Sequence, residues 1–199
     1  MVSRMGDDST IGGGVPAPGA AGQTERANGG LDQSNMIRAG LFGIQDGMVS
    51  NFGLIMGVAG AQVAPEAVLI AGIAGLLSGG LSMGAGEYVS VATQREMLEA
   101  GQVVEADDNV RATRAAFASS GLFALGAFIP LLPFLFTAGM TAVTISSILT
   151  GISLFAAGAI LTRLTKRSPW RSGARILVIG GGAGILAYLV GSALGVAVG

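Results

Sequence analysis

The sequence contains neither cysteine nor histidine, and only 12% of its 199 residues carry a charge. The missing cysteines exclude disulfide frameworks, iron–sulfur clusters and thiolate zinc sites. The missing histidines exclude imidazole metal sites, Ser-His-Asp triads and histidine general bases. The groups that remain for chemistry are carboxylates, hydroxyls, amides and methionine thioethers.

The scarcity of charge also defines the class of protein. Soluble domains carry about 25% charged residues, whereas here 51% of the residues are hydrophobic and the mean hydropathy is +0.66. This composition excludes an ordinary water-soluble globule and a disordered chain. A net charge of −1, without a basic stripe, provides no field that attracts nucleic acid. The sequence therefore predicts a membrane protein with no nucleic-acid partner.

Residues 1–35 differ in composition from the rest of the chain. They are rich in Gly, Ser, Asp, Asn and Gln, and they include Pro16 and Pro18. The segment has no apolar run long enough for the core of a signal peptide. We predict a disordered polar cytosolic tail over residues 1–35, with a segment that folds on a partner as the alternative. Residues 36–199 form the predicted transmembrane domain.

Five apolar stretches follow, each long enough at 1.5 Å per residue to cross a hydrocarbon core about 30 Å thick. The predicted all-α fold has five transmembrane helices, near residues 37–61, 67–93, 115–137, 142–162 and 176–198. Residues 115–162 carry no charge and are too long for one span, so we expect a break at 136–140 that makes a helical hairpin. Pro130 and Pro133 are expected to bend or locally open the third helix.

All eleven basic residues fall on one side of this topology. They lie before or at the start of the first span and in or beside the second and fourth connections, and none lies in the first or third connection. The positive-inside rule makes that side cytoplasmic, with the N-terminus inside and the C-terminus outside. The short connections favour a prokaryotic plasma membrane, and the same orientation suits a vacuolar membrane in a eukaryotic cell.

Two carboxylates, Asp46 and Glu87, lie within predicted spans. An ionised carboxylate inside a span costs at least about 2.5–3.5 kcal/mol, so such residues usually line a pathway or a bundle interior. A structural hydrogen bond to a neighbouring helix is the alternative role for Asp46. For Glu87, which lies near the cytoplasmic end of the second span, the alternative is an interfacial position already in water.

Each of these carboxylates has a potential co-ligand one helical turn away, Ser50 for Asp46 and Met83 for Glu87. Carboxylate and hydroxyl oxygens bind hard divalent cations, whereas a thioether adds affinity for softer ones. This combination suits Fe²⁺, and also Mn²⁺ or Co²⁺, whereas an all-oxygen site would suit Mg²⁺ or Ca²⁺. Simple packing is the alternative role for Met83.

The connection after the second span is acidic, and Glu96 and Glu99 share one face if the second helix continues into it. In that position they would collect cations at the cytoplasmic mouth. The alternative is that they are solvated residues that balance nearby arginines.

Two sequence motifs carry a resemblance to a known family. FGIQDGMVSN at residues 42–51, followed by Met56-Gly57-Val58, resembles the first-helix signature of the vacuolar iron transporter family. SMGAGEYVS at residues 82–90 resembles the second-helix signature. Supporting matches occur at Gly126 with Pro130 and Pro133, and at Arg171-Ser172-Gly173. The resemblance covers residues 36–199.

The resemblance implies a homodimer of five-helix protomers in the lipid bilayer, with the translocation path between the subunits. Members move Fe²⁺, and often Mn²⁺, out of the cytosol in exchange for protons, so the metal is a substrate and no resident cofactor or enzymatic activity is expected. By motif position, Asp46 and Met83 are implied as the metal-binding residues of the path. Glu87 is implied near the cytoplasmic entrance, with a role in proton coupling.

The sequence departs from the family pattern at two places. Gln45 occupies the position before the aspartate, where Asn is common. In addition, only residues 94–114 separate the second and third spans, so the Glu-rich cytoplasmic metal-binding domain of many members is absent, as in nodulin-like and some prokaryotic members. Glu96 and Glu99 are then interpreted as a remnant of the first helix of that domain. The missing domain leaves metal preference open but does not affect the path.

Two other functions remain as alternatives. An intramembrane hydrolase would need two carboxylates that share a proton, but Asp46 and Glu87 are predicted at different depths. A non-transporting membrane scaffold or metal-storage partner would use residues 1–35 as a docking arm. Replacing Asp46 by Asn distinguishes the transporter hypothesis from the scaffold hypothesis, because a scaffold should keep its function and a transporter should stop moving metal.

Overall fold

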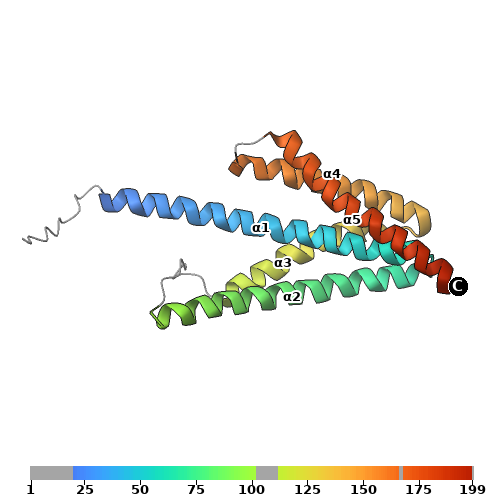
Figure 1. Ribbon diagram of the computed structural model, residues 1–199, viewed down its shortest axis with the longest axis horizontal. Helices are drawn as coiled ribbons and strands as arrows, with labels where there is room; N and C mark the ends of the chain where they lie inside the picture. The colour runs from blue at the N-terminus through green and yellow to red at the C-terminus, as the bar shows by residue number, and fades with distance from the viewer. Residues whose placement is uncertain (1–19, 102–111, 166–167, 199) are drawn as a thin grey trace, which may run out of the picture.

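The computed structural model describes the backbone of residues 20–101, 112–165 and 168–198, and in these ranges all regular structure is helical. Five long helices run roughly side by side along one axis (Figure 1). They are α1 (Ala20–Gly60), α2 (Pro65–Glu99), α3 (Ala112–Leu131), α4 (Gly139–Thr165) and α5 (Pro169–Val198), with a short 3₁₀ helix η1 (Leu132–Leu135) after α3. The predicted all-α class is confirmed.

Four segments of the described residues are long and apolar enough to cross a membrane: those in α2, α3 with η1, α4 and α5. The helix α1 is not among them. Its inner part carries Gln45, Asp46, Ser50 and Asn51, which lower the hydropathy of an otherwise apolar stretch. Four of the five predicted spans are therefore supported by composition and length, and the fifth coincides with the most polar helix of the bundle.

The helix α1 begins earlier than the first predicted span. It starts at Ala20 and continues without interruption to Gly60, so the polar residues 20–35 form the first part of the same helix. The first 19 residues of the predicted tail lie outside the described residues. A long helix that continues past its apolar part is physically reasonable, because helix propagation costs little once the apolar part has formed a nucleus.

The polar helix α1 is held at the centre of the bundle by its own apolar face. It contacts all four other helices. Phe52, Ile55 and Met56 are buried in a cluster with residues of α2, α3, η1 and α4, and Met48 packs with Leu154 and Ile176 of α4 and α5. Large apolar side chains on the outer faces, such as Leu81 of α2 and Ile185 of α5, are exposed. That pattern fits a protein surrounded by lipid, whose tails are as apolar as leucine.

Glycine allows α1 to approach its neighbours closely. A Cβ added to Gly126 of α3 would overlap the carbonyl of Ile44, and one added to Gly191 of α5 would overlap the carbonyl of Gly57. Backbone contact of this kind is the usual reason for small residues at membrane helix interfaces. Gly182, also in α5, has no described atom within 4 Å of the position where a Cβ would lie.

We expect Gly191→Val to destabilise the protein by about 1–3 kcal/mol, because the added side chain must push α5 away from α1. The matched control is Gly182→Val, which makes the same substitution in the same helix at an open position. Thermal unfolding of the purified protein in detergent measures both. Equal melting temperatures for the two variants would contradict the close α1–α5 contact.

The predicted break between the third and fourth spans is confirmed. Regular α-helix ends at Leu131, η1 follows, and α4 begins at Gly139, whose positive φ of 61° suits glycine. Pro130 lies inside α3 and Pro133 inside η1, and neither has an N–H to continue the helical hydrogen bonding. Two buried side chains from neighbouring helices donate to carbonyls here: Asn51 Nδ2 to Ala127 at 2.7 Å and Ser146 Oγ to Pro130 at 2.7 Å.

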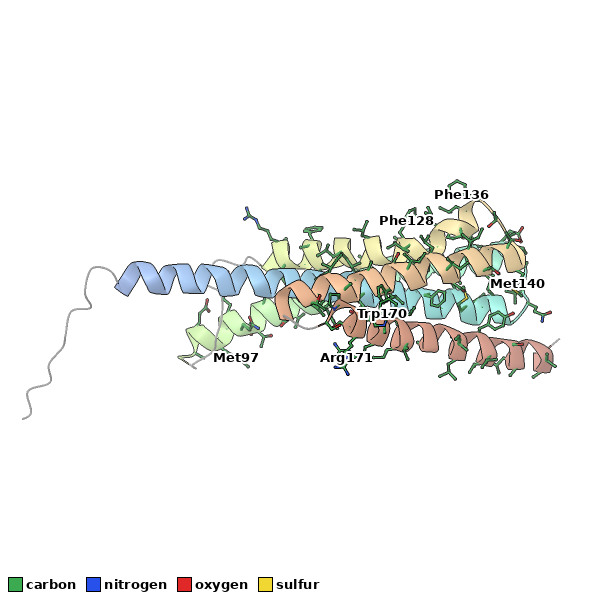
Figure 2. All side chains as sticks on the ribbon, turned by 90° about the horizontal axis from the view of Figure 1, so that it is seen from above. Met97, Phe128, Phe136, Met140, Trp170 and Arg171 are labelled. Atoms are coloured by element: carbon green, nitrogen blue, oxygen red, sulfur yellow. The ribbon has the colours of Figure 1, made fainter. Side chains whose placement is uncertain are left out.

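Successive helices run in opposite directions, so their ends alternate between the two ends of the bundle (Figure 1). Phe136 and Met140, at the α3–α4 connection, lie at one end, and Met97 near the end of α2 lies towards the other (Figure 2). The exposed residues Arg95, Arg114 and Arg171 belong to the end of α2 and the starts of α3 and α5. This arrangement is compatible with basic residues on one side of a membrane, and the assignment of that side to the cytosol stays a prediction.

Candidate metal-binding cleft

An open cleft of about 500 Å³ lies between α1 and α2, with α3 at its wall. Its lining includes one carboxylate, three hydroxyls, one amide and one thioether. The lining residues are Asp46, Ser50, Asn51, Leu54, Gly75, Ser78, Gly79, Ser82, Met83 and Phe123.

The cleft exists because one face of α2 has almost no side chains. Gly75, Ser78, Gly79 and Ser82 are spaced three and four residues apart, so they lie on the same side of the helix. None of these side chains is larger than a hydroxymethyl group, which leaves space in front of α1. The helices touch at the end of this stretch, where a Cβ on Gly75 would lie 2.5 Å from Leu54 Cδ2.

On α1, Asp46 and Ser50 are both exposed and line the cleft, as their spacing of one helical turn predicts. The Ser50 hydroxyl donates to the backbone carbonyl of Asp46 at 2.6 Å. Because its proton is used in that bond, the lone pairs of the Ser50 oxygen are the part available to a cation. The carboxylate of Asp46 is the only acidic group among the described lining residues.

On α2, Met83 is half-buried and reaches towards α1. A Cβ on Gly43 would lie 3.6 Å from its terminal methyl carbon. A longer residue at position 43 would compete with this side chain for space. The fold thus brings Met83 and Asp46, which are far apart in the sequence, to one cleft.

The other three predicted ligands do not line the cleft. Glu87 is half-buried one turn beyond Met83, and Glu96 and Glu99 are exposed near the end of α2. No group of three or more acidic side chains that could hold a metal ion occurs in the described parts of the chain. The roles of Glu87, Glu96 and Glu99 therefore stay predictions, and they are not supported by proximity to Asp46.

Asn51 is a cleft residue that was not predicted as a site residue, although it belongs to the same motif as Asp46. It is 2% exposed, and its Oδ1 has no hydrogen-bond partner among the described residues. A buried carbonyl left without a partner costs about 1–3 kcal/mol. The sequence does show an amide inside an apolar stretch. That its oxygen lacks a hydrogen-bond partner depends on how α1, α2 and α3 pack together.

A second cavity, of about 390 Å³, lies at the end of the bundle that carries the α1–α2 connection. Gln62 and Tyr188 are its most polar lining residues, and its described lining contains no carboxylate. Its chemistry does not suit a divalent cation. The cleft between α1 and α2 is the better candidate for a cation site.

Comparison with known families decides where the chain belongs. The sequence model that defines the VIT family matches residues 37–109 and 101–192, and these ranges together include all residues that line the cleft. The chain belongs to the VIT family. The resemblance seen in the two helix motifs is therefore confirmed, and the VIT-family relatives below are named as transporters or transporter homologs rather than as enzymes.

Relatives of this VIT-family protein are similar over most of their length. It is 34% identical over 160 residues to vacuolar iron transporter homolog 5 of Oryza sativa subsp. japonica, covering 75% of each chain. It is 32% identical over 176 residues to vacuolar iron transporter homolog 2 of the same organism, covering 80% of this chain and 91% of that one. VIT-like transporter 1b of Glycine max is 32% identical over 166 residues, covering 75% and 72%.

Proposed function

We propose that this VIT-family protein is a secondary transporter that exports a divalent transition metal, Fe²⁺ and also Mn²⁺, from the cytosol in exchange for protons. The observation that carries the proposal is the meeting of the Asp46 carboxylate and the Met83 thioether in one open cleft between α1 and α2. The printed names of the relatives, vacuolar iron transporter homologs, support a metal as the transported substrate.

The ligand set suits a transported ion better than a permanently bound one. One carboxylate with neutral oxygens and a thioether supplies a single negative charge, and affinity for a divalent ion rises with the number of charged ligands. The thioether favours a transition metal over Mg²⁺ or Ca²⁺. A site of moderate affinity can load from one side and release to the other.

Proton exchange follows from the same ligand set. A metal ligand must be deprotonated, so a proton on the Asp46 carboxylate competes directly with the cation. With one acidic group in the described lining, a single protonation removes the whole negative charge of the site. We propose that this step releases the metal on the side away from the cytosol.

The proposed assembly is a homodimer with the path between the subunits. The cleft is open along α1 and α2, so a second copy placed against it would enclose the ion and bring a second Asp46 and Met83 to the same axis. In this arrangement α1 is the fifth span, shielded from lipid by its own subunit and the partner. A prokaryotic plasma membrane is the proposed location, with the basic ends of α2, α3 and α5 in the cytosol.

Flux measurements in proteoliposomes test the proposal. We expect uptake of Fe²⁺ and Mn²⁺ that requires an imposed proton gradient, and that is absent from protein-free vesicles. Dissipating the gradient with an ionophore is the control for metal that merely binds to the outside. Absence of flux for either metal in well-folded protein would overturn the transporter proposal in favour of a membrane scaffold.

A further inference from the structure

Only one of the two polar atoms of the Asn51 side-chain amide makes a hydrogen bond among the described residues. Its Nδ2 donates to the carbonyl of Ala127 in α3 at 2.7 Å, whereas Oδ1 has no partner among the described residues. The orientation of the amide follows from this bond, because only the NH₂ group can face a carbonyl oxygen. The unsatisfied oxygen is therefore turned away from α3.

That oxygen faces Gly75 of α2. A Cβ on Gly75 would lie 2.6 Å from Asn51 Oδ1, so glycine is the residue that leaves room for it. Both residues line the cleft that also contains Asp46 and Met83. The unpartnered Asn51 Oδ1 thus lies in the wall of the cleft. The backbone of α2 covers it at Gly75, a residue without a side chain.

An amide carbonyl in this position has the properties of a metal ligand. It is a hard neutral oxygen, of the kind that binds divalent cations beside carboxylates. Asn51 Oδ1 has no hydrogen bond that must break before it accepts a cation. An amide oxygen also binds a cation without first losing a proton, whereas a carboxylate such as that of Asp46 must be deprotonated. Fixation by Ala127 also prevents the amide from turning its NH₂ towards the ion.

We propose that Asn51 Oδ1 is a further ligand of the transported cation, reached when α2 separates from α1 at Gly75. This step rests on the proposed function and adds a neutral ligand deeper in the cleft than Asp46. The assignment depends on the position of Asn51 in the cleft as well as on its unpartnered oxygen. Thr150 Oγ1 is also buried and unpartnered among the described residues, but it lies outside the cleft lining.

The test compares Asn51→Ala with Ser146→Ala in the purified full-length protein. Both substitutions remove a buried donor to an α3 carbonyl, so both should lower the melting temperature. Only Asn51→Ala also removes an oxygen from the cleft. Titration with Mn²⁺, followed by the electron paramagnetic resonance signal of the free ion, should give a Kd at least about tenfold higher for Asn51→Ala. The Kd of Ser146→Ala should equal that of the wild type.

A third variant separates loss of the oxygen from loss of the hydrogen bond to Ala127. Asn51→Asp also loses the donor to the Ala127 carbonyl, but it retains a side-chain oxygen and adds a charge, so it should bind Mn²⁺ more tightly than Asn51→Ala. Equal Kd values for Asn51→Ala, Ser146→Ala and the wild type would overturn the assignment of Asn51, as would equal Kd values for Asn51→Asp and Asn51→Ala. Failure of the wild type itself to bind Mn²⁺ would instead count against the proposed transport function.

Discussion

Asp46→Asn should reduce proton-driven metal flux at least about hundredfold while leaving the fold intact. A unit charge about 4 Å from a divalent ion is worth about 8 kcal/mol at an effective dielectric constant of 20, before the cost of desolvation. Even a third of that value corresponds to a factor of about one hundred. Asp46 is exposed, and an amide of the same shape should not disturb the packing of the helices.

The measurement is Mn²⁺ and Fe²⁺ flux into proteoliposomes, wild type beside Asp46→Asn. Glu66→Gln is the matched control, because it neutralises an exposed acid in the first turn of α2, outside the cleft. Any residual flux through Asp46→Asn should no longer depend on the proton gradient, since a carboxamide does not exchange a proton. Flux at the wild-type rate in this variant would rule out Asp46 as the coupling ligand.

The apolar spans and the hairpin break were predictable because they depend on local properties of the chain. An uncharged run too long for one span must turn, and Pro130 and Pro133 indicate where helical hydrogen bonding fails. The start of α1 was not predicted, because residues 20–35 are too polar for a span and yet continue the helix. Hydropathy identifies the membrane portion of a helix and does not locate the end of the helix itself.

The site was predictable only in part for a related reason. Helical periodicity places Ser50 beside Asp46 and Met83 beside Glu87, but it does not say which faces of α1 and α2 meet. The fold brings Met83 to the Asp46 cleft and leaves Glu87 outside its lining. The unsatisfied oxygen of Asn51 depends on the approach of Ala127 and Gly75 from two other helices. Such a contact requires the tertiary structure.

The role of Met83 leads to the second large effect, on the choice of metal. We expect Met83→Leu to lower the flux of Fe²⁺ about tenfold or more relative to that of Mn²⁺, because leucine fills a similar volume but offers no sulfur. Mn²⁺ prefers oxygen ligands and depends less on a thioether than Fe²⁺ does. The terminal methyl carbon of the half-buried Met83 lies 3.6 Å from the position that a Cβ on Gly43 of α1 would take, so a side chain of similar size should occupy the same space.

Met97→Leu provides the matched control for this experiment. Met97 is an exposed methionine near the end of the same helix (Figure 2), and it is not among the residues that line the cleft. Both variants lose one thioether from α2, and only Met83→Leu loses it from the cleft. A competition assay with Fe²⁺ and Mn²⁺ in the same vesicles gives the ratio directly. Equal ratios in Met83→Leu, Met97→Leu and wild type would mean that Met83 only packs, and selection of the ion would then rest on the oxygen ligands.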